Sequence, residues 1–423
     1  MTNAYHRIAL SDRIGYSEIL DPKFKTNTIK LVFYQPLSPE TASACALACD
    51  LATSSNHKYP SNEAMNRKLH LLYGADLGFS VSQQGDLQML TIHGSALADR
   101  YALDGEPVLD ALVEIVLDCL TDPNVTEGAF DAAEFRMKQQ ELLDAIDGEI
   151  NEKRVYAIRQ ARKTIYQNEP AAHSAHGTRE EALALTASST YEAFQTLLRT
   201  ATVEIFFVGP TARPDLPEKF KAAFDALGDA KATPVTYLSP SPMKDHVVTV
   251  TESLPVNQCK LVMAWKTADA DRYAVKLMAL LLGGTPSAKL FANVREKMSL
   301  CYYCAANYSE FKQTLLVDSG IETENLEKTQ HAIAEQLDAL RNGEITDEEL
   351  NSALMFVHNS LQGVGDTPNS YISWYLGQLC HGTNLTPSEE EGKYQAVTRA
   401  QLVEAANAFQ LDTLYTLTTQ DAE

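Results

Sequence analysis

One arrangement of strands and helices occurs twice in this chain, and that repeat limits its possible folds more than any other feature. The first copy starts with an apolar strand at residues 27–37 and ends with a strand at 202–209. The second copy starts at 257–267 and runs through the same order of elements to a strand at 413–419. Order and spacing match over about two hundred residues per copy, which chance alternation would not produce. The sequence therefore predicts two homologous halves in tandem.

Each half is expected to belong to the α+β class. Short turns, such as Gln84-Gly85-Asp86, join neighbouring strands, so most strands should pair antiparallel. The amphipathic helices should then pack on one face of each sheet. We predict an N-terminal half over 1–215 and a C-terminal half over 240–423. A linker region is predicted at 210–243 because prolines are frequent there: Pro210, Pro214, Pro217, Pro234, Pro240 and Pro242.

Two threonines occupy corresponding positions in the repeats, each ahead of a predicted helix. Thr126 and Thr346 are both followed by carboxylates within the next turn. A threonine oxygen can accept a hydrogen bond from the first free backbone N–H groups, and acidic residues favour the positive end of the helix dipole. Both are therefore predicted as N-caps.

The charge of the chain excludes several classes of partner. The formal net charge is −21 over 423 residues, which repels nucleic acid phosphates and anionic membrane surfaces. No apolar run is long enough to span a membrane, and the first residues lack the apolar core of a secretory signal. We expect a cytoplasmic protein that binds neither nucleic acid nor membranes.

Seven scattered cysteines fit a reducing compartment with mostly buried thiols. Two of them, Cys301 and Cys304, form a CxxC pattern within a predicted strand. Residues three apart on a strand face opposite sides of the sheet, and no second CxxC or suitably spaced histidine pair is present. The pattern thus argues against a metal or redox role for this pair.

The segment LLGGTPSAKLFANVREKMSLCYY, residues 281–303, carries a family resemblance. It is similar to the second-half signature of the pitrilysin/insulinase family, the inverzincin metallopeptidases. The matching residues are Gly283, Gly284, Ser287, Leu290, Phe291, Arg295, Glu296, Lys297, Leu300 and Tyr302. The tandem α+β halves fit the same family over nearly the whole chain.

The family holds its catalytic zinc with an HxxEH motif on the first long helix and a downstream glutamate. Aligned on that pattern, the two histidine positions fall on Leu47 and Leu51, and the base position falls on Asp50. The third-ligand position falls on Ala145, or on its neighbour Asp144. Leucine has no lone pair to give a metal, so we expect no zinc and no catalytic residue in this chain. By this reasoning the chain alone cannot hydrolyse peptides through the family's mechanism.

The resemblance implies substrate binding by Arg295 and Tyr302. A guanidinium stays charged and can donate several hydrogen bonds to peptide carbonyls, while a phenol can donate to an oxyanion. Packing offers another interpretation: Arg295 ends a helix, where a cation favours the dipole, and Tyr302 can pack in the sheet.

Loss of the zinc ligands together with retention of Arg295 and Tyr302 suggests a division of labour between two chains. The resemblance implies a heterodimer in which a homologous HxxEH-bearing chain holds the zinc and this chain adds the two side chains to a shared peptide chamber. Three alternatives stay open. The chain is an inactive peptide-binding or assembly protein, as a monomer or a homodimer; a structural subunit of a larger complex; or a peptidase whose metal is held by Asp50, Asp144 and a loop histidine.

Overall fold

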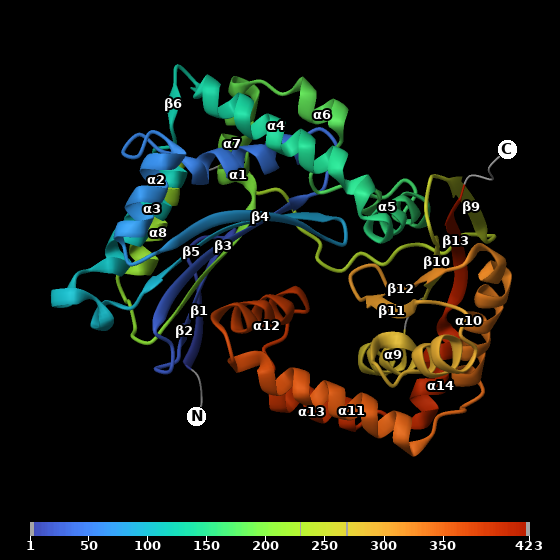
Figure 1. Cartoon of the computed structure of the whole chain (residues 1–423). Coiled ribbons are helices and arrows are strands. Elements are labelled where there is room, and N and C mark those ends of the chain that lie inside the picture. The colour runs from blue at the N-terminus through green and yellow to red at the C-terminus, as the bar shows by residue number, and fades with distance from the viewer. Residues whose placement is uncertain (1–3, 229, 268–269, 420–423) are drawn as a thin grey trace. The chain divides into compact units, whose positions relative to one another are not determined.

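The computed structural model describes residues 4–228, 230–267 and 270–419, and these form two compact units (Figure 1). The first unit comprises the residues up to 148 together with 173–236. The second comprises 149–172 together with the residues from 237 onward.

The first unit is built on a six-stranded sheet with the order β1-β2-β8-β3-β5-β4. Every pair is antiparallel except β2 and β8. The long strand β3 pairs with β5 along its whole length, from Thr26 opposite Leu97 to Pro36 opposite Leu87. The strands are β1 Ala4–Ala9, β2 Ile14–Leu20, β3 Thr26–Pro36, β4 Asp76–Gln84, β5 Leu87–Leu97 and β8 Thr202–Gly209.

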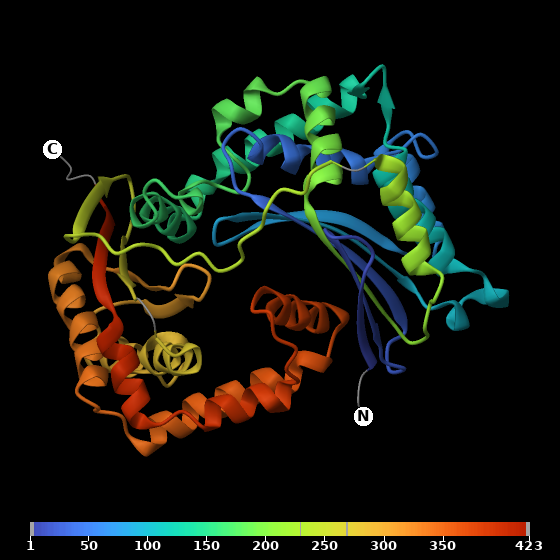
Figure 2. The same ribbon diagram turned by 180° about the vertical axis from the view of Figure 1, so that it is seen from behind.

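Helices cover one face of this sheet (Figures 1 and 2). Alternate apolar residues of β3 and β5 point to that face and meet apolar stripes of α1, α3, α7 and α8 in one core. The elements are α1 Ala42–Ser54, α2 Asn62–Leu71, η1 Asp99–Tyr101, η2 Leu103–Gly105, α3 Val108–Thr121, the hairpin β6 Val125–Thr126 and β7 Ala129–Phe130, α4 Ala132–Gly148, α6 Arg179–Ala184, α7 Ala187–Thr200 and α8 Leu216–Leu227.

The second unit has a five-stranded sheet with the order β11-β12-β10-β13-β9, in which only β13 and β9 are parallel. Its strands are β9 Val248–Ser253, β10 Cys259–Lys266, β11 Tyr303–Ser309, β12 Thr314–Ile321 and β13 Gln410–Thr418. Its helices are η3 Glu149–Asn151, α5 Lys153–Ile165, η4 Pro170–Ala172, α9 Arg272–Ala279, the π-helical segments η5 Leu280–Gly284 and η6 Leu290–Lys297, η7 Thr323–Asn325, α10 Leu326–Arg341, α11 Asp347–Gln362, η8 Gly363–Gly365, α12 Pro368–Cys380, α13 Pro387–Gln395 and α14 Arg399–Ala408.

The predicted α+β class with mainly antiparallel sheets is confirmed. The second sheet, however, carries helices on both faces. Leu261 and Met263 of β10 face the core formed with α9, α10 and α14. The alternate residues Val262 and Ala264 face the opposite way and pack with α5.

The unit boundaries differ from two contiguous halves. Helix α5 follows the first unit's α4 in the chain, yet its stripe Ala157, Ala161 and Ile165 packs on the second sheet. Residues 149–172 therefore join the second unit. The proline-rich stretch 210–243, interpreted as a linker, contains α8, whose Phe220 and Phe224 lie in the first core.

The two predicted N-caps have different outcomes. Thr346 is confirmed: its hydroxyl accepts from Glu349 N at 3.1 Å, and the Glu349 carboxylate accepts from Thr346 N at 2.8 Å. The prediction for Thr126 is wrong, because this residue lies in the small β6–β7 hairpin. Asp131 supplies the cap of α4 instead, accepting from the backbone N–H groups of residues 133 and 134.

The described helices include none with both the length and the apolar character needed to cross a membrane.

Candidate functional site

The positions aligned with the zinc-binding histidines lie in the apolar core of the first unit. Leu47 and Leu51 are each 1% exposed and sit one turn apart on α1. Most residues of α1 are small, among them alanines, serines and cysteines, which lets the helix lie close to the sheet and to α7. At these two positions the helix contributes packing and offers no metal ligand.

Asp50 lies between those leucines in sequence and has a cation as its neighbour. Lys138 of α4 reaches the Asp50 carboxylate at 3.1 Å and the Glu141 carboxylate at 3.0 Å. The Lys138 side chain is only 12% exposed and that of Asp50 22%. Burial raises the pKa of Asp50, and the charge of Lys138 counteracts that rise. An ammonium group thus fills the space beside the carboxylate and neutralises it.

A second polar contact joins α4 to the end of α1. The Ser55 hydroxyl donates a hydrogen bond to the Glu134 carboxylate, and the Asn124 amide donates to the Ser55 oxygen at 3.3 Å. Burial raises the pKa of Glu134, and its bonds to Ser55 and Asn124 counteract that rise. We call this set of contacts between α1 and α4, centred on Asp50 and Lys138, the α1–α4 seam.

Ala145 and Asp144 are exposed on α4, and Asp144 accepts a hydrogen bond from Gln140 at 2.7 Å. Lys138 is seven residues before Ala145, about 10 Å along a helix axis. The residue that α4 presents to Asp50 is therefore Lys138, which the sequence did not single out. Across residues 4–228, 230–267 and 270–419, no group of three or more His, Cys, Asp or Glu side chains is arranged to hold a metal ion.

Arg295 lies in the second unit on η6, and its side chain is 40% exposed. Its guanidinium lies over the Phe291 ring, 4.6 Å from the centroid, and 3.8 Å from the Glu296 carboxylate. The π-helical winding of η6 shifts side chains from their α-helical positions, a feature often found at functional sites.

Gly283 belongs to the same sequence signature, and its role is close packing. A Cβ at this position would lie 2.6 Å from the Leu290 side chain and 2.8 Å from the Ala306 backbone nitrogen. Only glycine lets η5 approach β11 so closely, and this approach places η6 at the end of the sheet.

Tyr302 precedes strand β11 and is 52% exposed. Its backbone N–H donates to the Gly320 carbonyl at 2.8 Å, which fixes the residue at the start of the ladder. Its phenol donates a hydrogen bond to the Glu322 carboxylate, and this bond raises the pKa of Tyr302. Glu322 is a second polar group that the sequence did not single out.

The structure brings Arg295 and Tyr302 to the same part of the second unit. The positive charge of Arg295 acts on the thiol of Cys301, the residue directly before Tyr302. Leu47, Asp50 and Leu51 lie together on α1, and the residue of α4 that reaches Asp50 is Lys138 rather than the predicted Ala145.

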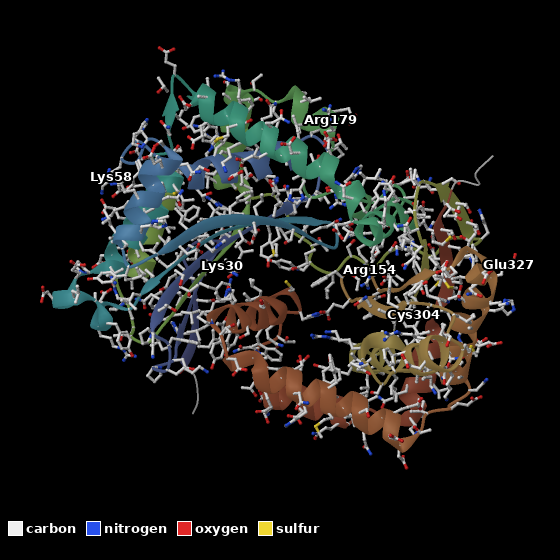
Figure 3. The ribbon with its side chains drawn as sticks, in the orientation of Figure 1. Lys30, Lys58, Arg154, Arg179, Cys304 and Glu327 are labelled. Atoms are coloured by element: carbon white, nitrogen blue, oxygen red, sulfur yellow. The ribbon has the colours of Figure 1, made fainter. Side chains whose placement is uncertain are left out.

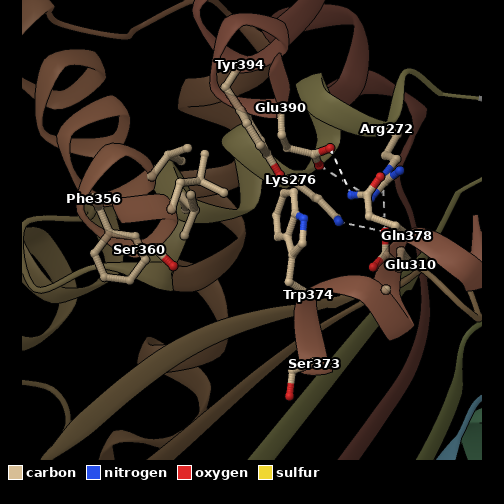
Figure 4. A pocket seen from close by; sticks show the side chains of 14 residues that line it. Arg272, Lys276, Glu310, Phe356, Ser360, Ser373, Trp374, Gln378, Glu390 and Tyr394 are labelled. Atoms are coloured by element: carbon tan, nitrogen blue, oxygen red, sulfur yellow. Dashed lines mark hydrogen bonds and ion pairs between the residues drawn. The ribbon is translucent and has the colours of Figure 1, made fainter. Parts of the chain in front are cut away.

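The second unit also contains a pocket of about 280 Å³ between α9, α11, α12 and α13 (Figure 4). Its apolar wall includes Leu280, Phe356, Leu361 and Trp374. The Trp374 indole donates to the Leu385 carbonyl at 3.1 Å, which fixes the ring. The volume suits one large side chain rather than a long peptide.

Charged groups at one side of this pocket converge on Glu310. Its carboxylate lies 2.6 Å from Lys276, 2.7 Å from His381 and 3.3 Å from Arg272. Burial raises the pKa of Glu310, but its bond to His381 and the charge of Lys276 outweigh that effect and lower it to about 2. Because the positive charges of Lys276 and Arg272 are paired with the Glu310 carboxylate, we expect the apolar residues of the pocket to determine which ligand it binds.

Comparisons with known proteins agree with this picture. Residues 184–356 match the family described as peptidase M16 inactive domain. The chain is 24% identical over 410 residues to the probable inactive metalloprotease YmfF of Bacillus subtilis (strain 168), covering 93% of each. A conserved protein from Enterococcus faecalis V583 has a similar structure with a TM-score of 0.92, 25% identity and 99% coverage of each chain. A protease from Helicobacter pylori shares the fold alone, with a TM-score of 0.80, 15% identity and coverage of 98% of this chain and all of that one. The resemblance predicted from the sequence is confirmed.

Proposed function

We propose that this chain, an inactive-type relative of the M16 metallopeptidases, is the non-catalytic subunit of a two-chain zinc peptidase. A homologous chain bearing HxxEH would supply the zinc and the general base. This chain would supply Arg295 and Tyr302 to bind the peptide. The observation that carries the proposal is the contrast between a zinc position filled by Leu47 and Leu51 and a signature segment whose polar side chains remain exposed.

The surroundings of Arg295 support a binding role. Its contacts with Phe291 and Glu296 hold the planar group in place while the side chain stays 40% exposed. A guanidinium has five N–H donors, so those two neighbours do not exhaust its capacity for peptide carbonyls.

The surroundings of Tyr302 specify how a peptide would bind. Its phenol donates to Glu322, so donation to a peptide carbonyl or an oxyanion requires exchange of that hydrogen bond. The released carboxylate of Glu322 can then accept from a peptide N–H group. Under this proposal Tyr302 is the donor and Glu322 the acceptor for the backbone of one bound peptide.

The test combines this chain with a candidate HxxEH-bearing homologue and measures peptide cleavage. We expect cleavage by the mixture and a loss of turnover of about tenfold or more for Arg295→Ala or Tyr302→Phe, with association unchanged. Arg179→Ala and Tyr101→Phe are matched controls, because both residues are exposed and lie on the first unit (Figure 3 labels Arg179). Full turnover in the Arg295 and Tyr302 variants would refute shared catalysis. Zinc bound at one ion per isolated chain would favour a different metal site.

The pocket of the second unit favours a second candidate, a peptide-binding or assembly protein with no role in proteolysis. Its apolar wall is formed entirely within that unit and includes the partly exposed Phe356. Peptide binding by the isolated chain that Phe356→Ala weakens and Arg295→Ala does not would support this candidate. Sedimentation of the isolated chain would establish whether it forms homodimers.

We place the two-chain peptidase in the cytoplasm. In the described part of the chain the cysteines are thiols rather than disulfides, which fits a reducing compartment. Fractionation of cells that produce the chain would test this location.

A further inference from the structure

Cys301 and Cys304 lie on the same side of the second sheet. Strand β11 begins at Tyr303, so Cys301 precedes the regular alternation of side chains. Cys304 belongs to the core of the second unit, and Cys301 packs against that same core. The prediction that these side chains face opposite sides of the sheet is therefore wrong, because only Cys304 lies within the strand. Figure 3 labels Cys304 on this edge strand.

The two thiols interact with each other and with polar neighbours. Each thiol affects the pKa of the other, and Ser319, which lies opposite Cys304 in the ladder, affects both. The positive charge of Arg295 lies near Cys301. The interaction with Cys304, together with Ser319 and Arg295, lowers the pKa of Cys301 to about 7, whereas the interaction with Cys301 and burial raise that of Cys304.

Cys301 differs from the other six cysteines in accessibility. It is half-buried, whereas the remaining six are buried. Burial raises the pKa of Cys45 to about 11 and that of Cys119 to about 12, which makes those thiols unreactive at neutral pH. One accessible thiol with a second thiol in contact is the arrangement that thiol–disulfide exchange requires.

We propose that Cys301 and Cys304 form a reversible disulfide by exchange with low-molecular-weight disulfides. The Cys301 thiolate attacks one sulfur of the small disulfide, forms a mixed disulfide and releases one small thiolate. Cys304 then loses its proton to water and attacks the Cys301 sulfur, which releases the second small thiol. Two protein thiols are oxidised and one small disulfide is reduced to two thiols, so electrons and protons balance.

The disulfide would alter the segment that presents Tyr302. The bond closes a ring around Tyr302 and Tyr303, and a disulfide brings its two Cα atoms within about 7 Å. Tyr302 already lies at a bend ahead of β11, and the disulfide would tighten that bend. Oxidation should therefore strain the hydrogen bond from the Tyr302 N–H to the Gly320 carbonyl. This consequence rests on the proposed function, whereas the exchange reaction itself does not.

The test incubates the full chain with oxidised glutathione and follows the product by intact mass and peptide mapping. We expect loss of two hydrogens, a Cys301–Cys304 crosslink, no retained glutathione and full reversal by dithiothreitol. At pH 7 Cys301 should react about 5-fold faster than an unfolded-peptide cysteine, since its greater thiolate fraction is partly counteracted by lower nucleophilicity.

Two variants separate the steps. Cys304→Ala should retain one glutathione on Cys301, whereas Cys301→Ala should give neither adduct nor crosslink. Cys380→Ala, which removes a buried thiol, should react as the unmodified chain does. A persistent glutathione adduct on the unmodified chain, a crosslink elsewhere or no reaction would each overturn the proposal, and mapping of the unmodified chain does not depend on the folding of any variant.

The link to peptide binding has its own readout. The oxidised chain should lose partner-dependent turnover, and dithiothreitol should restore it. If the reduced chain supports no turnover, the proposed function fails while the crosslink stands. If the crosslink forms and turnover is unchanged, the effect on Tyr302 is refuted.

Discussion

The α1–α4 seam and the segment that carries Arg295 and Tyr302 differ in what they could offer to a peptidase. Next to the seam, the two positions of α1 aligned with zinc ligands hold buried leucines. Within the seam, the Lys138 ammonium group pairs with the Asp50 carboxylate. In the other segment, Arg295 and Tyr302 are exposed polar side chains: Arg295 has donors that its neighbours do not use, and Tyr302 can exchange its hydrogen bond with Glu322. Leu47 and Leu51 belong to the hydrophobic core, whereas Arg295 and Tyr302 lie at the surface.

The buried residues and the exposed residues call for different physical explanations. Stability alone accounts for Leu47, Leu51 and Lys138, because burial and charge pairing give each a structural role. Stability accounts poorly for an arginine and a tyrosine that are about half exposed, since surface contacts of this kind contribute little. The exposure of this pair is the ground for the binding role that we propose for it.

The largest expected effect comes from restoring imidazoles to the seam. Leu47→His with Leu51→His places two polar rings in a dry core, and we expect a loss of at least about 5 kcal/mol in the free energy of unfolding. Urea denaturation measures this loss. Leu71→His is the matched control, because Leu71 is an exposed leucine on α2 and its replacement should cost less than about 1 kcal/mol. A stable double variant that binds zinc would show that the seam is still a metal site.

The seam also shows where sequence reasoning succeeds and where it ends. A leucine at a ligand position is sufficient to predict the loss of metal chemistry, because side-chain identity decides it. The partner of Asp50 is not predictable in that way, since Lys138 is 88 residues away and reaches it only through the packing of α4 on α1.

The fold likewise has features that local sequence patterns predict and features that they do not. Most strands of the two sheets and their mainly antiparallel pairing follow from local patterns and were predicted, whereas β1, β2 and β9 lie outside the two predicted copies. Helix α5 lies on the second sheet because its alanines pack against β10. This contact is between residues far apart in the sequence, so no local pattern predicts it. Similarly, Thr126 is a residue type common at N-caps, and carboxylates follow it. The structure instead has a hairpin there with strands of two residues each, and Asp131 caps the helix.

A smaller effect is expected from removing the cation of the seam. Lys138→Met keeps an apolar stem but leaves the Asp50 carboxylate buried without its partner. We expect a loss of about 1–3 kcal/mol at pH 7, less than for a fully buried pair because both side chains have some exposure. Lys58→Met is the control: its pair with Glu114 is about half exposed, and a change within about 0.5 kcal/mol is expected. Equal effects in the two variants would contradict the seam as described.

The pH dependence of Lys138→Met adds a sharper criterion. Burial raises the pKa of Asp50 in the folded state, so its charged form opposes folding above that pKa and the cost disappears below the unfolded value of 3.8. Removal of Lys138 enlarges the cost. The difference between the variant and the original chain should therefore be largest at neutral pH and shrink as the pH falls toward 3.8. A difference that is constant between pH 7 and pH 4 would assign the effect to packing.

The two predicted N-caps, one in each unit, should differ by a smaller amount in their effect on the free energy of unfolding. Thr346→Ala removes one acceptor of a capping box and should cost about 1 kcal/mol. Thr126→Ala changes an exposed hairpin residue and should alter stability by less than about 0.5 kcal/mol. Thermal unfolding of both variants, with serine at each position as the conservative control, measures the difference. If Thr126→Ala lowers the stability more than Thr346→Ala does, the hairpin contributes more to the stability of its unit than its contacts indicate.

The smallest expected effect on stability is the most informative about function. Arg295→Ala and Tyr302→Phe should each change the free energy of unfolding by less than about 0.5 kcal/mol, because their contacts with Phe291, Glu296 and Glu322 are at the surface. Urea denaturation of the isolated chain and peptide turnover with the partner chain should therefore disagree, with stability retained and turnover lost. If instead both variants lose stability in proportion to turnover, the exposed pair is structural and the contrast with the seam disappears.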